Sequence, residues 1–112
     1  MNPPKFPEFI QNLPEADLPV AGIRGWLVQS EQGQVLFLQA DQQVQIPSHS
    51  HGDQWGIVID GAMELAIGEK TATFRQGDSY FIPAGTSHGA VLHQGFRALD
   101  YFADKNRYKI KA

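Results

Sequence analysis

Hydrophobic and polar residues alternate in short segments along most of the chain. After residue 21, roughly nine stretches are rich in Val, Ile, Leu, Phe and Tyr, and Gly, Pro, Asp or Ser separate them. This pattern is typical of short strands joined by tight turns. The expected strands lie within residues 22–29, 33–40, 43–47, 54–60, 62–68, 71–77, 78–83, 89–93 and 96–103.

The pattern predicts an all-β fold. No segment has the periodicity of a helix of three or more turns, and many short strands usually build sandwiches or closed barrels. The first ~20 residues carry five of the seven prolines, so they predict an extended arm with at most one helical turn at "EFIQNL". We therefore expect an N-terminal arm over 1–21 and a single β-domain over 22–112.

Composition narrows the classes of partner. A chain of 112 residues with 42% hydrophobic and 19% charged residues is ordinary for one globular domain. A net charge of -3 argues against a nucleic-acid surface, which needs clustered Lys and Arg. No apolar run approaches the ~18 residues of a membrane span, and the first ten residues do not resemble a signal peptide. We expect a cytoplasmic protein with a small-molecule partner.

Histidines supply the candidate chemistry. The chain has no cysteine, so a metal would need nitrogen and oxygen ligands. His49 and His51 would share one face of an extended segment, and two imidazoles on one strand can form half of a metal site. An exposed or merely packed pair is the alternative.

A second stretch, "GDSYFIPAGTSHGAVL", brings a third histidine to a strand start. Gly77 suits the turn before a strand, Pro83 suits its end, and Gly85 turns the chain back towards His88. Two segments therefore each place histidine at a strand junction.

These two stretches resemble the paired sequence motifs of the cupin superfamily. The first motif is His-x-His, three or four residues, Glu, six residues, Gly; the second is Gly, five residues, Pro-x-Gly, two residues, His, three residues, Asn. The second matches residues 77–88, although Leu92 occupies the Asn position. The resemblance covers about residues 33–102 and implies a small cupin β-barrel (a double-stranded β-helix or jelly roll). It also implies one divalent transition metal, Zn, Ni, Fe, Mn or Cu, held by the histidines.

Gln54 occupies the glutamate position of the first motif, seven residues before Gly61. Some cupins are similar in using a glutamine as the fourth ligand, so the resemblance implies this role for Gln54. The alternative is that Asp53 turns inward and Gln54 only donates hydrogen bonds. If Gln54 faces inward, so does Gly56, which would leave open volume for substrate. A neutral amide ligand leaves the metal at +2 and favours anionic ligands.

The last expected strand, "RALDYFADKNRY", resembles the corresponding segment of small uronate-linearising cupins of pectin breakdown. That resemblance implies that Asp100 is the general base, that Phe102 contacts substrate and that Arg107 binds a carboxylate. A final strand with one inward polar residue, followed by a solvated tail, is the alternative.

Strand alternation predicts that Trp55, Ile57 and Ile59 face outward. Either the N-terminal arm or a second subunit would have to cover these residues, and we expect a homodimer. His93 lies five residues after His88, so we expect it on the surface.

Two classes of function remain open from the sequence. One is a metal-dependent enzyme that acts on a small anionic or sugar-like molecule by lyase, isomerase or dioxygenase chemistry. The other is a metal-dependent binding or sensor module without turnover. Inward polar groups beside the metal favour the enzyme.

Overall fold

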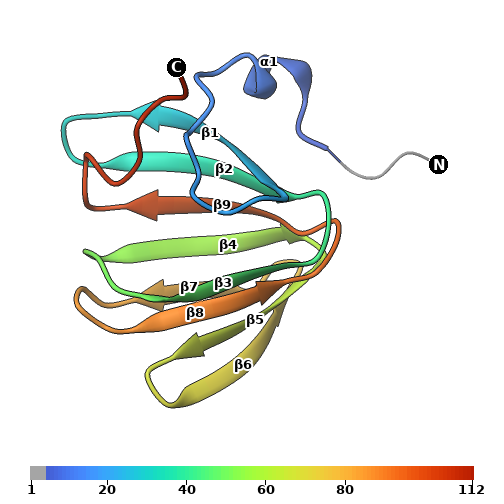
Figure 1. Ribbon diagram of the computed structural model, residues 1–112, viewed down its shortest axis with the longest axis vertical. Helices are drawn as coiled ribbons and strands as arrows, with labels where there is room; N and C mark the ends of the chain where they lie inside the picture. Colours follow the sequence, from blue (N-terminus) through green and yellow to red (C-terminus); the bar gives the residue numbers. More distant parts are fainter. Residues whose placement is uncertain (1–4) are drawn as a thin grey trace.

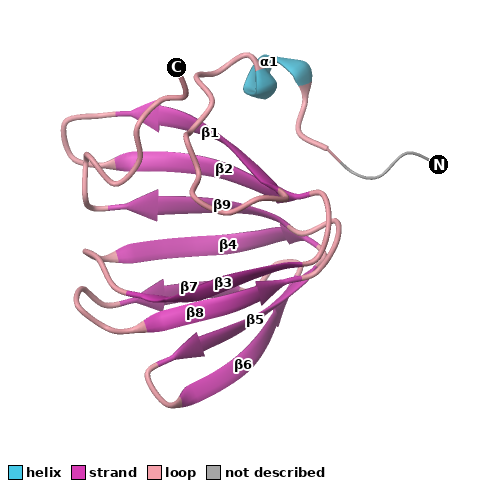
Figure 2. Cartoon of the chain, in the orientation of Figure 1, coloured by secondary structure: helices cyan, strands magenta, loops and turns pink. Residues whose placement is uncertain are grey.

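The computed structural model describes residues 5–112 as two antiparallel sheets with one helical turn (Figures 1 and 2). The prediction of an all-β fold with nine strands is confirmed, as is the helical turn. Residues 1–4 of the expected arm lie outside the described residues. No helix within 5–112 is long and apolar enough to cross a membrane. The elements are α1 (Glu8–Gln11), β1 (Ile23–Gln29), β2 (Gln34–Ala40), β3 (Val44–His49), β4 (Gln54–Asp60), β5 (Ala62–Ile67), β6 (Lys70–Arg75), β7 (Ser79–Ile82), β8 (His88–Leu92) and β9 (Arg97–Phe102).

The two sheets enclose the core between them. One has the strand order β1-β2-β9-β4-β7 and the other β3-β8-β5-β6, so strands far apart in sequence become neighbours in each. Val58 and Ala98 of the first sheet belong to the same buried cluster as Met63 and Leu92 of the second. Inward side chains of both sheets therefore share this core cluster, and a second cluster joins Leu27, Leu36 and Phe102 of the first sheet to Ala16.

Strand alternation decides which side chains face the core. In β4, Gly56 and Val58 are buried, whereas Trp55 between Gln54 and Gly56 is 45% exposed. β9 runs beside β4, and its buried residues include Asp100, which lies opposite Gly56 in the register. A polar residue thus reaches the interior at the centre of the first sheet.

The N-terminal arm covers part of the outer face of the first sheet. Phe6 is 4% exposed, and its ring packs edge-on against Trp26 of β1 at 6.1 Å and Phe37 of β2 at 5.6 Å. The Arg97 guanidinium lies 4.9 Å from the centroid of the Phe6 ring. These aromatic and cation contacts fix the arm to β1 and β2.

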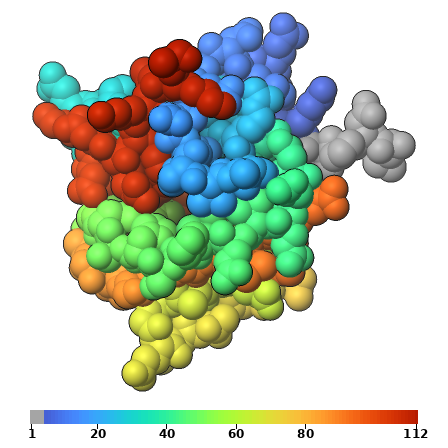
Figure 3. Space-filling model, in the orientation of Figure 1, coloured from blue at the N-terminus to red at the C-terminus, as the bar shows by residue number. Residues whose placement is uncertain are grey.

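Residues 15–17 lie side by side with the C-terminal residues 109–111 next to β1, where blue and red atoms meet in Figure 3. The backbone N–H of Asp17 donates to the Lys109 carbonyl at 2.8 Å, and that of Lys111 donates to the Glu15 carbonyl at 2.8 Å. This pairing holds the segments around residues 18–20 and 107–108, which contribute to the cavity described below.

We expect Phe6→Ala to lower the free energy of unfolding by about 3 kcal/mol, because it removes a buried aromatic ring and leaves a cavity over Trp26. Urea denaturation followed by tryptophan fluorescence measures the change. Phe9→Ala is the matched control, because Phe9 is 75% exposed and its loss should change stability by no more than about 0.5 kcal/mol. Equal effects of the two substitutions would show that the arm is not fixed by Phe6.

Candidate metal centre

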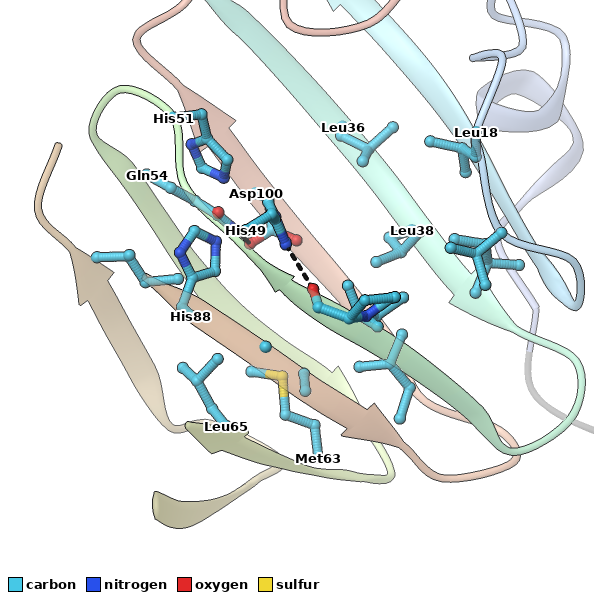
Figure 4. A pocket seen from close by; sticks show the side chains of 18 of the residues that line it. Leu18, Leu36, Leu38, His49, His51, Gln54, Met63, Leu65, His88 and Asp100 are labelled. Carbon is cyan, nitrogen blue, oxygen red and sulfur yellow. Dashed lines mark hydrogen bonds between the residues drawn. The ribbon is translucent and has the colours of Figure 1, made fainter. Parts of the chain in front are cut away.

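Three histidines meet at one end of the cavity between the sheets (Figure 4). His49 ends β3, His51 follows in the next loop, and His88 begins β8. The ladder pairs His49 with His88 after an irregularity that begins at Ile46, and such a bulge can re-aim side chains. The ring centroids are 4.3 Å apart for His49 and His88, and 4.7 Å apart for His51 and His88.

Backbone hydrogen bonds fix the tautomer of all three imidazoles. Each Nδ1 lies 2.8–3.0 Å from a backbone carbonyl oxygen, and the acceptors are those of Pro47, Gly52 and Thr86. A carbonyl oxygen can only accept, so each Nδ1 carries the hydrogen. In the neutral ring Nε2 then holds the lone pair. This is the arrangement in which histidine ligates metals, with the other nitrogen bound to a carbonyl.

The Nε2 atoms of His51 and His88 are buried and have no hydrogen-bond partner among the described residues. A buried polar atom without a partner costs about 1–3 kcal/mol, so a site with two of them calls for a ligand. The candidate ligand atoms of His49, His51 and His88 all lie within 4.8 Å of one another. The cluster could therefore hold one metal ion.

Burial lowers the pKa of both His51 and His88 below the ordinary histidine value, and the neighbouring Arg107 and His49 lower it further. The hydrogen bonds to the backbone carbonyls of Gly52 and Thr86 oppose this shift. The lower pKa favours neutral rings at neutral pH. Neutral imidazole is the form that binds a metal.

Gln54 and Asp100 line the cavity beside the histidines (Figure 4). The Asp100 carboxylate is buried and accepts hydrogen bonds through Oδ1 from the Tyr80 hydroxyl at 2.6 Å and from Gln54 Nε2 at 3.0 Å. Burial raises the pKa of Asp100 to about 6, although both hydrogen bonds act in the opposite direction. Burial and the nearby Asp100 charge raise the pKa of Tyr80 well above its usual value.

The hydrogen bond to Asp100 also orients the Gln54 amide. The Nε2 end donates to the carboxylate, so the Oε1 end is left to face another partner. Asp53, the alternative fourth ligand, is exposed and absent from the cavity lining. Its Oδ1 accepts a hydrogen bond from the backbone N–H of Ala84 at 2.7 Å. Gln54, and not Asp53, is therefore the residue that the structure brings into the cavity.

The expectation of open volume beside Gly56 is wrong. A Cβ at Gly56 would collide with Asp100 Oδ1 and with the Tyr80 ring, so these two side chains fill the space. Gly56 is absent from the cavity lining. Because Gly56 has no side chain, the Tyr80 hydroxyl of β7 can reach across β4 to Asp100 of β9.

Arg107 and Phe102 lie at the same end of the cavity. The Arg107 guanidinium stacks over the rings of Tyr108 at 4.4 Å and Phe102 at 5.9 Å, and its Nε is buried without a hydrogen-bond partner. Among residues 5–112, no carboxylate forms an ion pair with it. Phe102 also packs edge-on against His51 at 5.5 Å. The Arg107 guanidinium thus lines the cavity without an ion-pair partner among residues 5–112, although the Asp100 carboxylate lines the same cavity.

Sequence reasoning missed Tyr80, which holds Asp100 in place. Alternation along "SYFIP" could have indicated that Tyr80 and Ile82 face inward together, since both are buried and Phe81 is 55% exposed. His93 lies outside the cavity, where its Nε2 faces a Glu64 oxygen at 3.4 Å.

The family follows from comparison with known proteins. Residues 28–99 match the family model described as a cupin domain. The chain belongs to the cupin family. No curated protein matches it significantly.

Solved structures of cupins share the fold of this chain. An RmlC-like cupin from Shewanella frigidimarina has a TM-score of 0.76 at 21% identity, covering 92% of this chain and 91% of its own. KdgF from Halomonas sp. has a TM-score of 0.71 at 24% identity, covering 79% of this chain and 85% of its own. Oxalate decarboxylase from Bacillus subtilis, a protein with Mn(II) centres, has a TM-score of 0.73 at 17% identity, covering 87% of this chain and 29% of its own.

We expect His88→Ala to abolish stoichiometric metal binding, because it removes one of the three Nε2 lone pairs. His93→Ala should leave binding intact, because His93 is on the surface and faces Glu64. Elemental analysis after chelator treatment and reloading measures metal per chain. Equal loss of metal in both variants would contradict the assignment of the cluster.

Proposed function

We propose that this cupin is a metal-dependent enzyme that acts on a small anionic molecule, a carboxylate or a sugar acid. The observation that carries this proposal is the tautomer of the three histidines, which leaves three Nε2 lone pairs at one place. His49, His51, His88 and Gln54 would hold one divalent transition metal ion. Nitrogen and amide-oxygen ligands suit Zn, Ni, Fe, Mn and Cu alike.

The proposed ligands are all neutral. The metal would keep its full +2 charge, where a glutamate in place of Gln54 would reduce the charge to +1. When bound, such an ion polarises a substrate oxygen and stabilises negative charge that develops on it. The neutral ligand set therefore favours an anionic substrate over a neutral one.

The other polar groups of the cavity complete the proposed chemistry. Arg107 would bind a substrate carboxylate, because its guanidinium forms no ion pair with any carboxylate of residues 5–112. Asp100 would move a proton, as it is the one carboxylate among the lining residues. Phe102 would flank the bound molecule, since its ring lies between His51 and Tyr108.

One structural neighbour supports a small acid as substrate. Oxalate decarboxylase acts, by its name, on a small dicarboxylate. It is 17% identical to this chain, so the proposal rests mainly on the site itself.

We expect Gln54→Glu to hold the metal more tightly and to bind small carboxylates at least tenfold more weakly. One added negative charge ~4 Å from a bound carboxylate costs about 4 kcal/mol at an effective dielectric constant of ~20, and ~1.4 kcal/mol is tenfold in affinity. Chelator competition measures metal retention, and calorimetric titration of metal-loaded protein with acetate measures carboxylate affinity.

A double variant controls for the neighbouring carboxylate. Gln54→Glu alone places two acids beside each other, because Gln54 now donates to Asp100. Adding Asp100→Asn again gives positions 54 and 100 one amide donor and one carboxylate acceptor. The pair then carries a single negative charge, as in the natural protein. Acetate binding that is as tight in Gln54→Glu as in the natural protein would refute the electrostatic role of Gln54.

We propose further that the protein is a homodimer through an outer stripe of Trp55, Ile57, Ile59 and Phe81. Trp55 is 45% and Phe81 is 55% exposed, and the two are paired across β4 and β7. Within the described residues, the arm covers the β1 and β2 part of the same face through Phe6, and Trp55 and Phe81 remain exposed. A contiguous apolar patch on a surface usually marks an interface.

Light scattering at micromolar concentration should give about twice the 12.4 kDa of one chain. Phe81→Glu should halve that mass, because it places a charge within the proposed interface. Phe9→Glu is the control, since Phe9 is an even more exposed aromatic residue away from the stripe. A natural protein that is monomeric at this concentration would rule the dimer out.

A further inference from the structure

The cavity at the candidate metal centre continues well beyond the polar side chains. Its volume is about 490 Å³, within the range of ~300–1,000 Å³ that small-molecule sites occupy. Figure 4 shows His49, His51, Gln54, His88 and Asp100 gathered at one end, with leucines and a methionine along the remaining walls. The cavity therefore has a polar end and an apolar remainder.

The strand register orders the walls into successive layers away from the histidines. In the second sheet, His49 pairs with His88 at the polar end. Ile46 then pairs with Ala90, which also pairs with Leu65 of β5. These three side chains form the middle layer of the cavity.

The deepest layer is also apolar. Leu92 of β8 pairs with Met63 of β5, two residues further from the histidines. In the first sheet, Leu38 lies two residues beyond Leu36, and Leu36 pairs with Asp100. All of these side chains line the cavity. The side chains of Met63, Leu92 and Leu38 are apolar and their backbone groups are used in the strand ladders, so this layer offers a ligand no free hydrogen-bonding group.

We propose that the natural ligand is a monocarboxylate with an unbranched apolar chain, whose carboxylate lies at the histidine end and whose chain runs between the sheets. This inference rests on the proposed function, because it requires the metal centre and Arg107 to bind the carboxylate. It narrows the substrate class and disfavours polyhydroxylated sugar acids.

Burial in the apolar layers favours a monocarboxylate with an apolar chain over a polyhydroxylated sugar acid. A methylene that enters the apolar layers is removed from water, which strengthens binding by about fourfold per group, equivalent to ~0.8 kcal/mol. A hydroxyl that enters the same layers exchanges hydrogen bonds with water for none, which weakens binding. Affinity should therefore rise as methylenes are added to the chain and fall as hydroxyls are added to it.

Calorimetric titration of Mn²⁺-loaded protein with acetate, butanoate, hexanoate and octanoate tests the inference. Affinity should rise by about fourfold per added methylene until the cavity is full. Gluconate is the matched probe, because it has the six carbons of hexanoate with hydroxyls along the chain. We expect it to bind at least tenfold more weakly than hexanoate.

The outcomes separate the two proposals. If no acid binds the loaded protein, both the proposed function and this inference fail. If acetate binds but affinity does not rise along the series, or gluconate binds as tightly as hexanoate, the proposed function survives and the apolar-chain ligand is overturned.

One variant tests where the chain lies. Ala90→Leu fills the middle layer, so it should weaken octanoate binding at least tenfold relative to acetate binding. Val91→Leu is the control on the same strand, because Val91 pairs with Glu64 and Gln45 on the outer face and should leave the affinity ratio unchanged. If Ala90→Leu does not fold, the chain-length series in the natural protein still decides the inference.

Discussion

The antiparallel pairing of β3 with β8 is the constraint on which the rest of the site depends. It brings His49 beside His88 from two segments that are distant in sequence. The irregularity of the ladder lies between the Ile46–Ala90 pair and the His49–His88 pair. The same ladder places Ala90 and Leu92 at increasing depth behind the histidines. One set of backbone hydrogen bonds therefore fixes both the ligand cluster and the polarity gradient of the cavity behind it.

Features of the site that depend on local sequence were predictable. Alternation and turn residues placed the nine strands, because a strand with one buried face has a period of two. The His-x-His pair and the Gly, Pro and Gly before His88 are likewise short-range patterns, so the histidines could be grouped without coordinates. The choice between Asp53 and Gln54 was not local. It depends on the N–H of Ala84, which lies in a different loop and binds the Asp53 carboxylate.

The interior of the first sheet was less predictable, because it depends on strand order. Asp100 was expected to face inward, but nothing in its own strand indicates that β7 lies on the far side of β4. That order brings Tyr80 across Gly56 to the carboxylate. Asp100 consequently holds the Gln54 amide in one orientation, a positioning role that coexists with any role in proton transfer. The position of the arm was similarly undecided, because Phe6 could have covered either part of the outer face.

The apolar walls of the cavity strengthen the electrostatic effect of the Arg107 guanidinium. Coulomb attraction rises as the effective dielectric constant falls, so Arg107 would act more strongly on an anionic ligand beside Phe102 and Tyr108 than it would in water. The same surroundings make its unpartnered Nε costly while the site is empty. A carboxylate from the protein at this position would stabilise the free chain, and it would also compete with an anionic ligand. Stability and the proposed anion binding are therefore opposed at Arg107, and the lack of an ion-pair partner within the described part of the chain would favour anion binding.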